Sequence, residues 1–141
     1  MTLRRLLAAL SMVLLLTTAL PAQVTARLVA IDTSVQPGQP VRVALRLDHE
    51  KAWHTYWKHA GTGYPTTLEW QLPAGWRASG FDWPTPHLMR DREGAIIGHG
   101  YEGTILLPLT ITPPDGLQPG TQVTLSATAD WLMCKESCMP G

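Results

Sequence analysis

The sequence ends with Asp130-Trp-Leu-Met-Cys-Lys-Glu-Ser-Cys-Met-Pro-Gly141, and this stretch contains both cysteines of the 141-residue chain, Cys134 and Cys138. The two Cα atoms of a disulfide usually lie roughly 4.4–6.8 Å apart, whereas four steps along an extended strand span about 13 Å. The chain must therefore bend between the cysteines, in a hairpin or in one helical turn, if they are to bond. Because the preceding residues, Thr121–Trp131, have a strand-like pattern, we predict a hairpin with its tip at 135–137.

A disulfide that closes so short a ring adds little stability. The chain-entropy model gives about 2 kcal/mol for a loop of this length, which is a weak constraint for a domain of this size. Small, strained and exposed disulfides are more often reducible than structural. The cysteine pair alone leaves three interpretations open, namely a redox-active pair, an inert disulfide and a metal site.

Residues 1–22 have the pattern of a secretory signal peptide. A short basic segment, Met1–Arg5, precedes the mostly apolar Leu6–Leu20, and Ala22 and Ala26 are candidate cleavage sites. The alternative is an uncleaved membrane anchor, although the apolar run is short for a membrane span. Export would place the cysteines in an oxidising compartment, where disulfides persist.

The charge and length of the remaining chain, residues 23–141, limit its function. The full sequence has 11 basic and 11 acidic residues, and removal of Arg4 and Arg5 with the signal peptide leaves 9 basic and 11 acidic residues, a net charge of −2. This balance argues against a nucleic-acid partner, which requires a basic surface. About 120 residues suit a single domain with its own core.

Alternating apolar and polar residues predict β-strands throughout this domain. The clearest is Tyr101–Thr112, where Ile105, Leu107, Leu109 and Ile111 share one face. Further strands are predicted at Ala26–Ser34, Val41–Asp48, Trp53–Trp57, Thr66–Leu72, Trp76–Trp83 and Thr121–Trp131. We predict a long loop over Pro84–Gly100 with a short strand at Ala95–Ile97, since this segment has two prolines, several glycines and no sustained period.

Short strands with turn signals about every ten residues, and no amphipathic helix, predict an all-β sandwich. A hairpin at the cysteines needs a returning strand, and the sequence stops at Gly141. We therefore expect the sandwich to lack its last strand or strands through truncation, with residues 23–141 being a fragment of a longer protein.

The cysteine stretch, Trp131–Gly141, resembles the cysteine hairpin in the N-terminal periplasmic domain of the thiol:disulfide interchange protein DsbD family. The resemblance extends over nearly all of residues 23–141. Its further matches are Trp53-His-Thr-Tyr-Trp57, Gly61-Thr-Gly-Tyr-Pro-Thr66, Leu72-Pro-Ala-Gly-Trp76 and Tyr101-Glu-Gly-Thr-Ile-Leu-Leu-Pro-Leu-Thr110. The three residues between the cysteines are fewer than in the better-known members, and this spacing resembles the shorter, copper-tolerance-associated branch.

The resemblance implies an immunoglobulin-like β-sandwich that forms one domain of a protein-disulfide reductase. Cys134 and Cys138 would be its redox-active centre, with Cys138 forming the mixed disulfide. Electrons would arrive from membrane-embedded and thioredoxin-like domains and pass to periplasmic disulfide isomerases or cytochrome c maturation proteins. The domain would lie in the periplasm and bind no cofactor itself, and the full-length protein would lie in the inner membrane. A cap loop that shields the cysteines would fall within Pro86–Gly100, with Leu88 or Met89 as the apolar shield.

Two other functions compete with this redox interpretation. Soft sulfur ligands suit Cu(I), so Cys134 and Cys138 with the flanking Met133 and Met139 are a candidate periplasmic copper site. An interaction domain with an incidental disulfide is the second alternative. A hydrolase is not supported, because the sequence has no Gly-x-Ser-x-Gly motif.

No classical general base adjoins the cysteines in the sequence. His99 and Tyr101 are candidates to approach them through folding, and the alternative is that both are ordinary residues at the edge of a strand. We adopt thiol:disulfide exchange through Cys134 and Cys138 as the predicted function.

Overall fold

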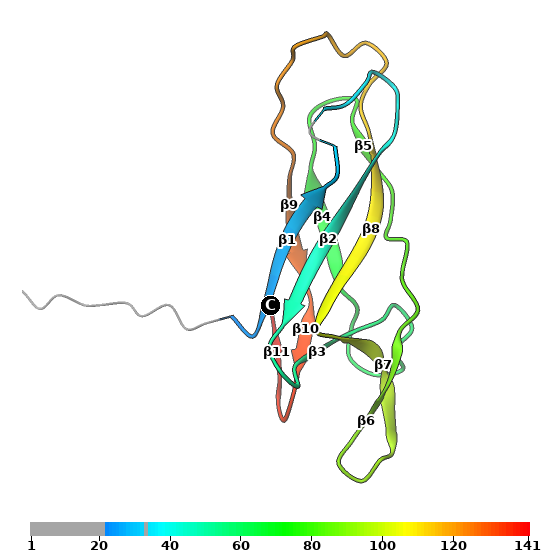
Figure 1. Ribbon diagram of the computed structural model, residues 1–141, viewed down its shortest axis with the longest axis vertical. Helices are drawn as coiled ribbons and strands as arrows, with labels where there is room; N and C mark the ends of the chain where they lie inside the picture. Colours follow the sequence, from blue (N-terminus) through cyan, green and yellow to red (C-terminus); the bar gives the residue numbers. More distant parts are fainter. Residues whose placement is uncertain (1–21, 33) are drawn as a thin grey trace, which may run out of the picture.

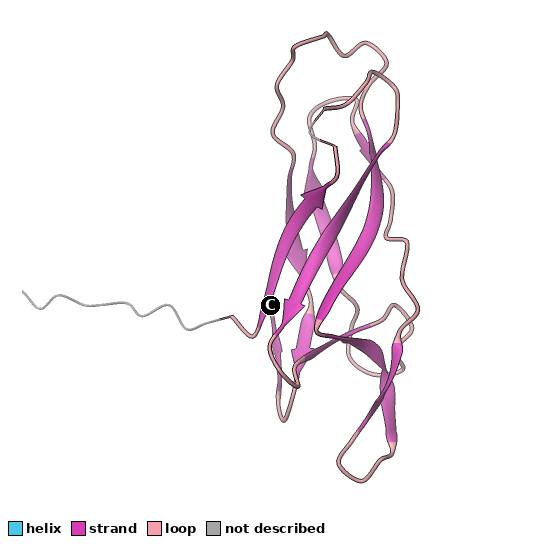
Figure 2. Cartoon of the chain, viewed as in Figure 1, coloured by secondary structure: helices cyan, strands magenta, loops and turns pink. Residues whose placement is uncertain are grey.

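The computed structural model describes residues 22–32 and 34–141, and these form strands, turns and loops without a helix (Figures 1 and 2). None of these residues therefore belongs to a helix that is long and apolar enough to cross a membrane. The predicted signal peptide lies outside the described residues except for Ala22. The strands are β1 (Val24–Ala30), β2 (Val41–His49), β3 (His54–Tyr56), β4 (Thr67–Gln71), β5 (Arg77–Ala78), β6 (His87–Arg90), β7 (Ile96–Glu102), β8 (Thr104–Thr112), β9 (Ser126–Asp130), β10 (Leu132–Cys134) and β11 (Cys138–Pro140).

The strands form three antiparallel sheets that pack as a sandwich. One sheet has the order β1-β2-β8-β5, a second has the order β11-β10-β3-β7-β6, and β4 pairs with β9. Figure 1 shows β1, β2 and β8 side by side along the molecule, with β4 and β9 behind them. The turn between β10 and β11 and the hairpin of β6 and β7 project from the same end. The predicted all-β sandwich is therefore confirmed.

The core lies between these layers and follows the alternation of the sequence. Leu45 and Leu47 of β2 and Leu107 of β8 are buried in one cluster with Tyr101 and Met133 from the second sheet. A second cluster joins Leu109 and Ile111 of β8 to Trp76. The predicted inward face of β8 is thus confirmed, because β-strand side chains alternate between two faces.

The strand predicted over Tyr101–Thr112 is wrong in its continuity, because the chain breaks at Gly103 and changes sheet. β7 ends at Glu102 and pairs with β3, whereas β8 begins at Thr104 and pairs with β2. Gly103 adopts φ +65°, a conformation that glycine reaches without a steric penalty. The apolar pattern runs through the break, so periodicity could not locate it.

The long loop predicted over Pro84–Gly100 is also wrong, because most of it is the hairpin of β6 and β7. The predicted short strand at Ala95–Ile97 overlaps the start of β7. A bulge between Met89 and Arg90 shifts the register of β6, which disturbs the period of two that would mark a strand.

Other strand ends differ by several residues from the prediction. β1 ends at Ala30, β5 contains only Arg77–Ala78, and β9 begins at Ser126. The predicted cysteine hairpin is confirmed, and its returning strand is the three-residue β11.

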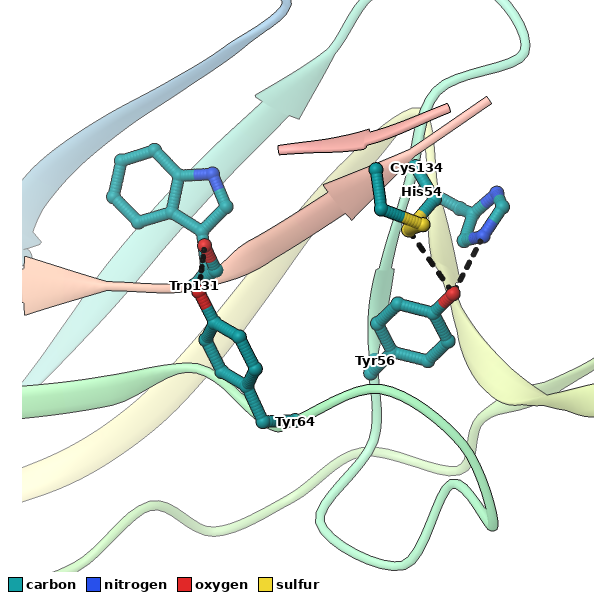
Figure 3. Close-up of a disulfide and its surroundings, with 6 residues drawn as sticks. His54, Tyr56, Tyr64, Trp131 and Cys134 are labelled. Carbon is teal, nitrogen blue, oxygen red and sulfur yellow. Dashed lines mark hydrogen bonds between the residues drawn. A yellow bond between two sulfur atoms is a disulfide. The ribbon is translucent and has the colours of Figure 1, made fainter. Parts of the chain in front are cut away.

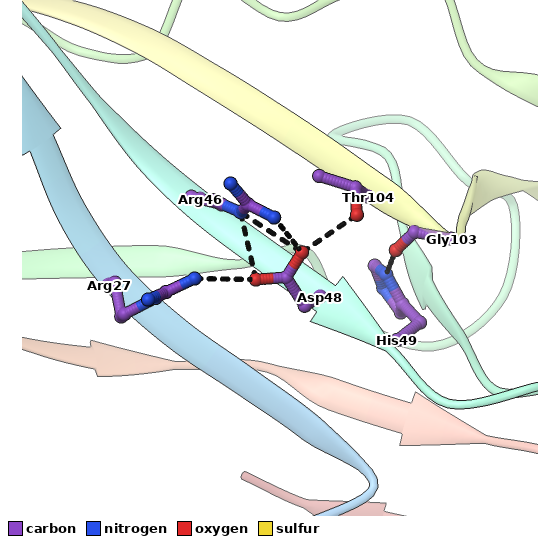
Figure 4. A network of polar contacts seen from close by, with 6 residues as sticks. All are labelled: Arg27, Arg46, Asp48, His49, Gly103 and Thr104. Carbon is purple, nitrogen blue, oxygen red and sulfur yellow. Dashed lines mark hydrogen bonds and ion pairs between the residues drawn. The ribbon is translucent and has the colours of Figure 1, made fainter.

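Polar side chains connect three strands on the outside of the first sheet (Figure 4). Asp48 of β2 accepts hydrogen bonds from Arg46 (2.8 Å), from Arg27 of β1 (3.3 Å) and from Thr104 of β8 (2.7 Å). The bonds from Arg46 and Thr104 hold the pKa of the Asp48 carboxyl well below its usual range. This carboxylate stays ionised and ties β1, β2 and β8 together.

His49 connects β2 to the break between β7 and β8. Its Nδ1 lies 2.6 Å from the carbonyl oxygen of Gly103, and its Nε2 lies 2.9 Å from Oγ1 of Thr55 on β3. A carbonyl only accepts, so Nδ1 carries the hydrogen and Nε2 of the neutral ring accepts from the Thr55 hydroxyl. Burial lowers the pKa of His49, so the neutral ring that fits these contacts is favoured.

We expect the free energy of unfolding to decrease as the pH falls below the ordinary histidine value of 6.5. The lowered pKa of folded His49 means that the unfolded chain binds more protons, and the contribution of His49 is lost as the pH falls through the folded pKa. Denaturant unfolding at about pH 8 and about pH 5 measures this difference. His49→Gln should reduce the difference in the free energy of unfolding between the two pH values, whereas His59→Gln, an exposed control, should not. An equal pH dependence in the wild type and both variants would contradict the role assigned to His49.

Candidate functional site

Cys134 and Cys138 form a disulfide across the hairpin of β10 and β11, with Cα atoms 4.1 Å apart. The flanking backbone hydrogen bonds run from Gly141 N to Trp131 O (2.9 Å) and from Lys135 N to Ser137 O (3.1 Å). The alternation of antiparallel pairing makes the cysteines a non-hydrogen-bonded pair, in which opposite Cα atoms are closest. The register of a short hairpin therefore brings the two sulfur atoms together.

The two cysteines differ in exposure. Cys134 is buried, with 3% of its surface accessible, whereas Cys138 is exposed. The sheet order explains this difference, because β10 is covered by β3 on one side and β11 on the other, while β11 is an edge strand. A reacting partner therefore has access to Cys138 and not to Cys134.

The cysteines share one face of the five-stranded sheet with residues from three other strands. Residues directly opposite in neighbouring strands point to the same face. Cys134 is opposite His54, His54 is opposite Glu102, and Met89 is opposite Gly98. We call this side the cysteine face, and it consists of Cys138, Pro140, Cys134, Leu132, His54, Tyr56, Glu102, Gly100, Gly98, His87 and Met89.

Tyr56 contacts the buried cysteine, and His54 contacts Tyr56 (Figure 3). The Tyr56 hydroxyl donates to Sγ of Cys134 at 3.1 Å, and Nε2 of His54 lies 3.4 Å from the same hydroxyl oxygen. The His54 and Tyr56 rings meet edge to face, with centroids 5.4 Å apart. Burial raises the pKa of Tyr56 and lowers the pKa of His54, so at neutral pH Tyr56 keeps its proton and His54 is uncharged.

Met89 covers this face, and Leu88 does not. Met89 is 6% exposed and belongs to a buried cluster with Tyr56, Ala60 and Cys134. Gly100 leaves the space that Met89 occupies, since a Cβ atom at Gly100 would lie 2.7 Å from the Met89 sulfur and would clash with the Thr55 carbonyl oxygen. Leu88, the other predicted shield residue, is 52% exposed and lies on the opposite face of β6.

An ion pair joins the two hairpins at this end of the molecule. Arg92, in the turn between β6 and β7, contacts Glu136 at the tip of the cysteine hairpin. Both side chains are largely exposed. This contact connects the segment that carries Met89 to the segment that carries the disulfide.

The structure does not bring together the four ligands of the alternative copper site. Met133 and Met139 are opposite each other in the hairpin, and alternation directs them to the core side of the sheet, away from the cysteines. Met133 is buried in the core cluster, and Met139 packs against it. Within residues 22–32 and 34–141, no group of three or more histidine, cysteine, aspartate or glutamate side chains has an arrangement suited to a metal ion.

The two candidates for an acid or base, His99 and Tyr101, form other contacts. The His99 ring lies against Trp57, and the Tyr101 hydroxyl donates to the Pro84 carbonyl oxygen at 2.7 Å, with burial raising the pKa of Tyr101 to about 12. Sequence reasoning missed Tyr56 and His54 as site residues. The available signal was the alternation of side chains along the predicted strand Trp53–Trp57, which places His54 and Tyr56 on the same face.

Comparison with known proteins gives one family and one fold. The profile of the family described as "Thiol:disulfide interchange protein DsbD, N-terminal" matches residues 22–141. A solved structure, the N-terminal periplasmic domain of ScsB from Proteus mirabilis, superimposes with a TM-score of 0.61 at 19% sequence identity. The match covers 86% of this chain and 44% of that one, so this chain spans less than half of the solved domain. No curated protein matches the sequence.

We expect Glu136→Gln to accelerate reduction of the disulfide by a small thiol by less than about fivefold, because exposed ion pairs contribute little. Loss of the Arg92–Glu136 contact would remove one link between the β6–β7 turn and the cysteine hairpin, and thereby favour movement of the turn away from the cysteines. The rate is followed by mass spectrometry after alkylation, and the acceleration should vanish at high salt, where the wild-type pair is screened. Glu93→Gln removes one negative charge from the turn between β6 and β7 and should leave the rate unchanged. An equal acceleration in this control would contradict a role for the Arg92–Glu136 ion pair.

Proposed function

Because the chain belongs to the family of the N-terminal domain of thiol:disulfide interchange protein DsbD, we propose that it exchanges disulfides with partner proteins through Cys134 and Cys138. The observation that carries the proposal is the bonded pair at a sheet edge, with an exposed Cys138 and a buried Cys134. Exchange requires one accessible sulfur for intermolecular attack and a second sulfur that resolves the mixed disulfide. An exposed and a buried cysteine suit these two roles.

In the reductive half of the cycle, a thiolate of the electron donor attacks Sγ of Cys138. The bond between Cys138 and Cys134 breaks, a mixed disulfide forms at Cys138, and the electron pair leaves with Cys134. A second donor thiolate then attacks the donor sulfur of the mixed disulfide and releases Cys138 as a thiolate. The domain has gained two electrons, and the donor has become a disulfide.

In the other half of the cycle, the Cys138 thiolate attacks a disulfide of the acceptor protein. One acceptor sulfur leaves as a thiolate, and a mixed disulfide again forms at Cys138. The Cys134 thiolate then attacks Sγ of Cys138, which regenerates the internal disulfide and releases the second acceptor thiolate. Only Cys138 has to meet another protein in either half, which agrees with its position on the edge strand β11.

Met89 has the position of a shield for this chemistry. It is buried against the cluster that contains Cys134 and Tyr56, and it comes from a hairpin whose turn contacts the cysteine tip. We assign the shielding role to Met89 rather than Leu88, because the Leu88 side chain lies on the other face of β6. The shield would keep small oxidants and water from the buried sulfur between encounters.

The chain would act in the periplasm as one domain of a larger protein-disulfide reductase. The signal-like residues 1–22, the family and the periplasmic origin of the similar ScsB domain support this location. Membrane-embedded and thioredoxin-like domains would supply electrons, and disulfide isomerases or cytochrome c maturation proteins would accept them. No cofactor is needed in the domain, because the two sulfur atoms carry the two electrons.

We expect the Cys134–Cys138 pair to equilibrate with glutathione at a reduction potential of roughly −120 to −270 mV, the range of oxidoreductases. In the presence of oxidised glutathione, Cys134→Ser should form a stable mixed disulfide at Cys138 roughly tenfold faster than Cys138→Ser forms one at the buried Cys134. Titration and mass spectrometry measure the two quantities. A potential below about −300 mV would mark a structural disulfide and overturn the proposed function.

Met89→Ala tests the shield. Truncation of a buried methionine should lower the free energy of unfolding by about 2–5 kcal/mol and leave a cavity beside Cys134. Under conditions where the variant remains folded, we expect faster reduction of the disulfide by a small thiol. Leu88→Ala is the matched control, since it truncates an exposed neighbour on the other face and should change neither quantity; a Met89→Ala chain that is reduced at the wild-type rate would remove the shield from the mechanism.

A further inference from the structure

Tyr56 is the polar partner of the buried sulfur. Its hydroxyl donates to Sγ of Cys134 at 3.1 Å, and both residues are almost fully buried (Figure 3). The remaining members of their cluster, Ala60, Met89 and Leu132, are apolar. In these apolar surroundings, a hydroxyl that donates to the sulfur atom stabilises the sulfur whenever it becomes a thiolate.

The exchange reaction places a negative charge on this sulfur. When the internal disulfide is opened by attack on Cys138, Cys134 leaves as a thiolate. Burial in apolar surroundings disfavours a thiolate and would slow this step. A hydrogen bond to a charged acceptor is about twice as strong as a neutral one, so the Tyr56 hydroxyl offsets the cost at the moment the charge forms.

The neighbours of Tyr56 favour this role. The hydroxyl has one hydrogen, and its oxygen lies 3.4 Å from Nε2 of His54. When His54 carries its hydrogen on Nε2, it donates to the Tyr56 oxygen, and the Tyr56 hydrogen is left for the sulfur. Burial raises the pKa of Tyr56, so the hydroxyl remains a donor throughout the neutral pH range.

We propose that Tyr56 is a catalytic residue that stabilises the Cys134 thiolate, and that His54 is a positioning residue that directs the Tyr56 hydrogen to the sulfur. This inference rests on the proposed exchange function. In each direction the bond changes are those of exchange alone: Cys134 takes the electron pair when the internal disulfide opens and returns it when the disulfide closes. Tyr56 keeps its proton and contributes a hydrogen bond, so no other reactant is needed.

The charged and titratable groups around this sulfur come from several elements. They are His54 on β3, Glu102 on β7, His87 on β6, Lys135 and Glu136 at the hairpin tip, and Arg92 in the turn between β6 and β7. Glu136 and Arg92 are paired with each other. These groups remain unchanged in the comparison of Tyr56 with a control tyrosine, so a difference between the two variants reports on the hydroxyl of Tyr56.

Tyr56→Phe and Tyr64→Phe are the matched pair of variants. Each removes one hydroxyl, but the Tyr64 hydroxyl donates to the Trp131 carbonyl oxygen at 3.4 Å and has no bond to either cysteine. With dithiothreitol as the reductant, we expect Tyr56→Phe to slow opening of the disulfide roughly tenfold or more, the effect of losing a hydrogen bond to a charged group. Tyr64→Phe should react at the wild-type rate. Equal rates in all three chains would overturn the inference.

A titration separates catalysis from packing. In the Cys138→Ser background, the ultraviolet absorbance of the thiolate gives the pKa of Cys134, and Tyr56→Phe should raise it by about one unit or more. His54→Phe should raise it by less and should change the pH profile of the reduction rate, whereas a merely structural role for His54 would leave both unchanged.

If Tyr56→Phe does not fold, the inference can still be tested by comparing the pKa values of Cys134 and Cys138 in single-cysteine chains that retain Tyr56. Burial alone would place the pKa of Cys134 above that of the exposed Cys138, whereas the inference expects Cys134 to titrate at or below Cys138. These tests use a small dithiol and need no partner. An oxidoreductase-like potential with no effect of Tyr56 would therefore overturn this inference alone, while a potential below about −300 mV would overturn the proposed function.

Discussion

The pairing of β10 with β3 is the contact on which the site depends. Only Met133 and Cys134 of β10 pair with Thr55 and His54 of β3, yet this short ladder fixes which side chains meet. Because a strand alternates its side chains, Met133 enters the core and Cys134 faces outward. A register shift of one residue would exchange these two positions, bury the thiol in the core and separate it from His54 and Tyr56.

The same alternation gives the two faces of the five-stranded sheet different roles. The core face carries Met133, Thr55 and Tyr101, which pack against the sandwich and hold the sheet in place. The cysteine face carries the disulfide, the tyrosine and the histidine, and Met89 covers it from β6. In the proposed exchange, stability and chemistry would therefore use alternate residues of the same strands, with the sulfur atoms on the face that does not pack against the sandwich core.

The difference between the cysteines follows from the position of their strands. The bond that joins them is symmetric, but β10 is an inner strand and β11 is an edge strand. Cys134 therefore accepts a hydrogen bond from a hydroxyl group and is surrounded by apolar side chains, whereas Cys138 is exposed to solvent. In the proposed disulfide exchange, this asymmetry would direct the incoming thiolate to the exposed sulfur and make the buried sulfur the leaving group.

Local regularities of the sequence determined much of this protein. The alternation of Ile105, Leu107, Leu109 and Ile111 predicted the inward face of β8, and the cysteine spacing predicted a hairpin. Both features depend on neighbours within a strand or turn, so they can be predicted without knowledge of long-range contacts. The resemblance to the DsbD family additionally implied an immunoglobulin-like sandwich and a redox role for the cysteine pair.

Only the tertiary structure decided what depends on distant contacts. The break at Gly103 and the β6–β7 hairpin were missed, because a change of sheet leaves the apolar pattern intact and a bulge hides a strand. Tyr56 and Cys134 are 78 positions apart in the chain, so their hydrogen bond has no local signal. The register between β3, β10 and β11 brings them together, and register is set by which residues the assembled core can bury.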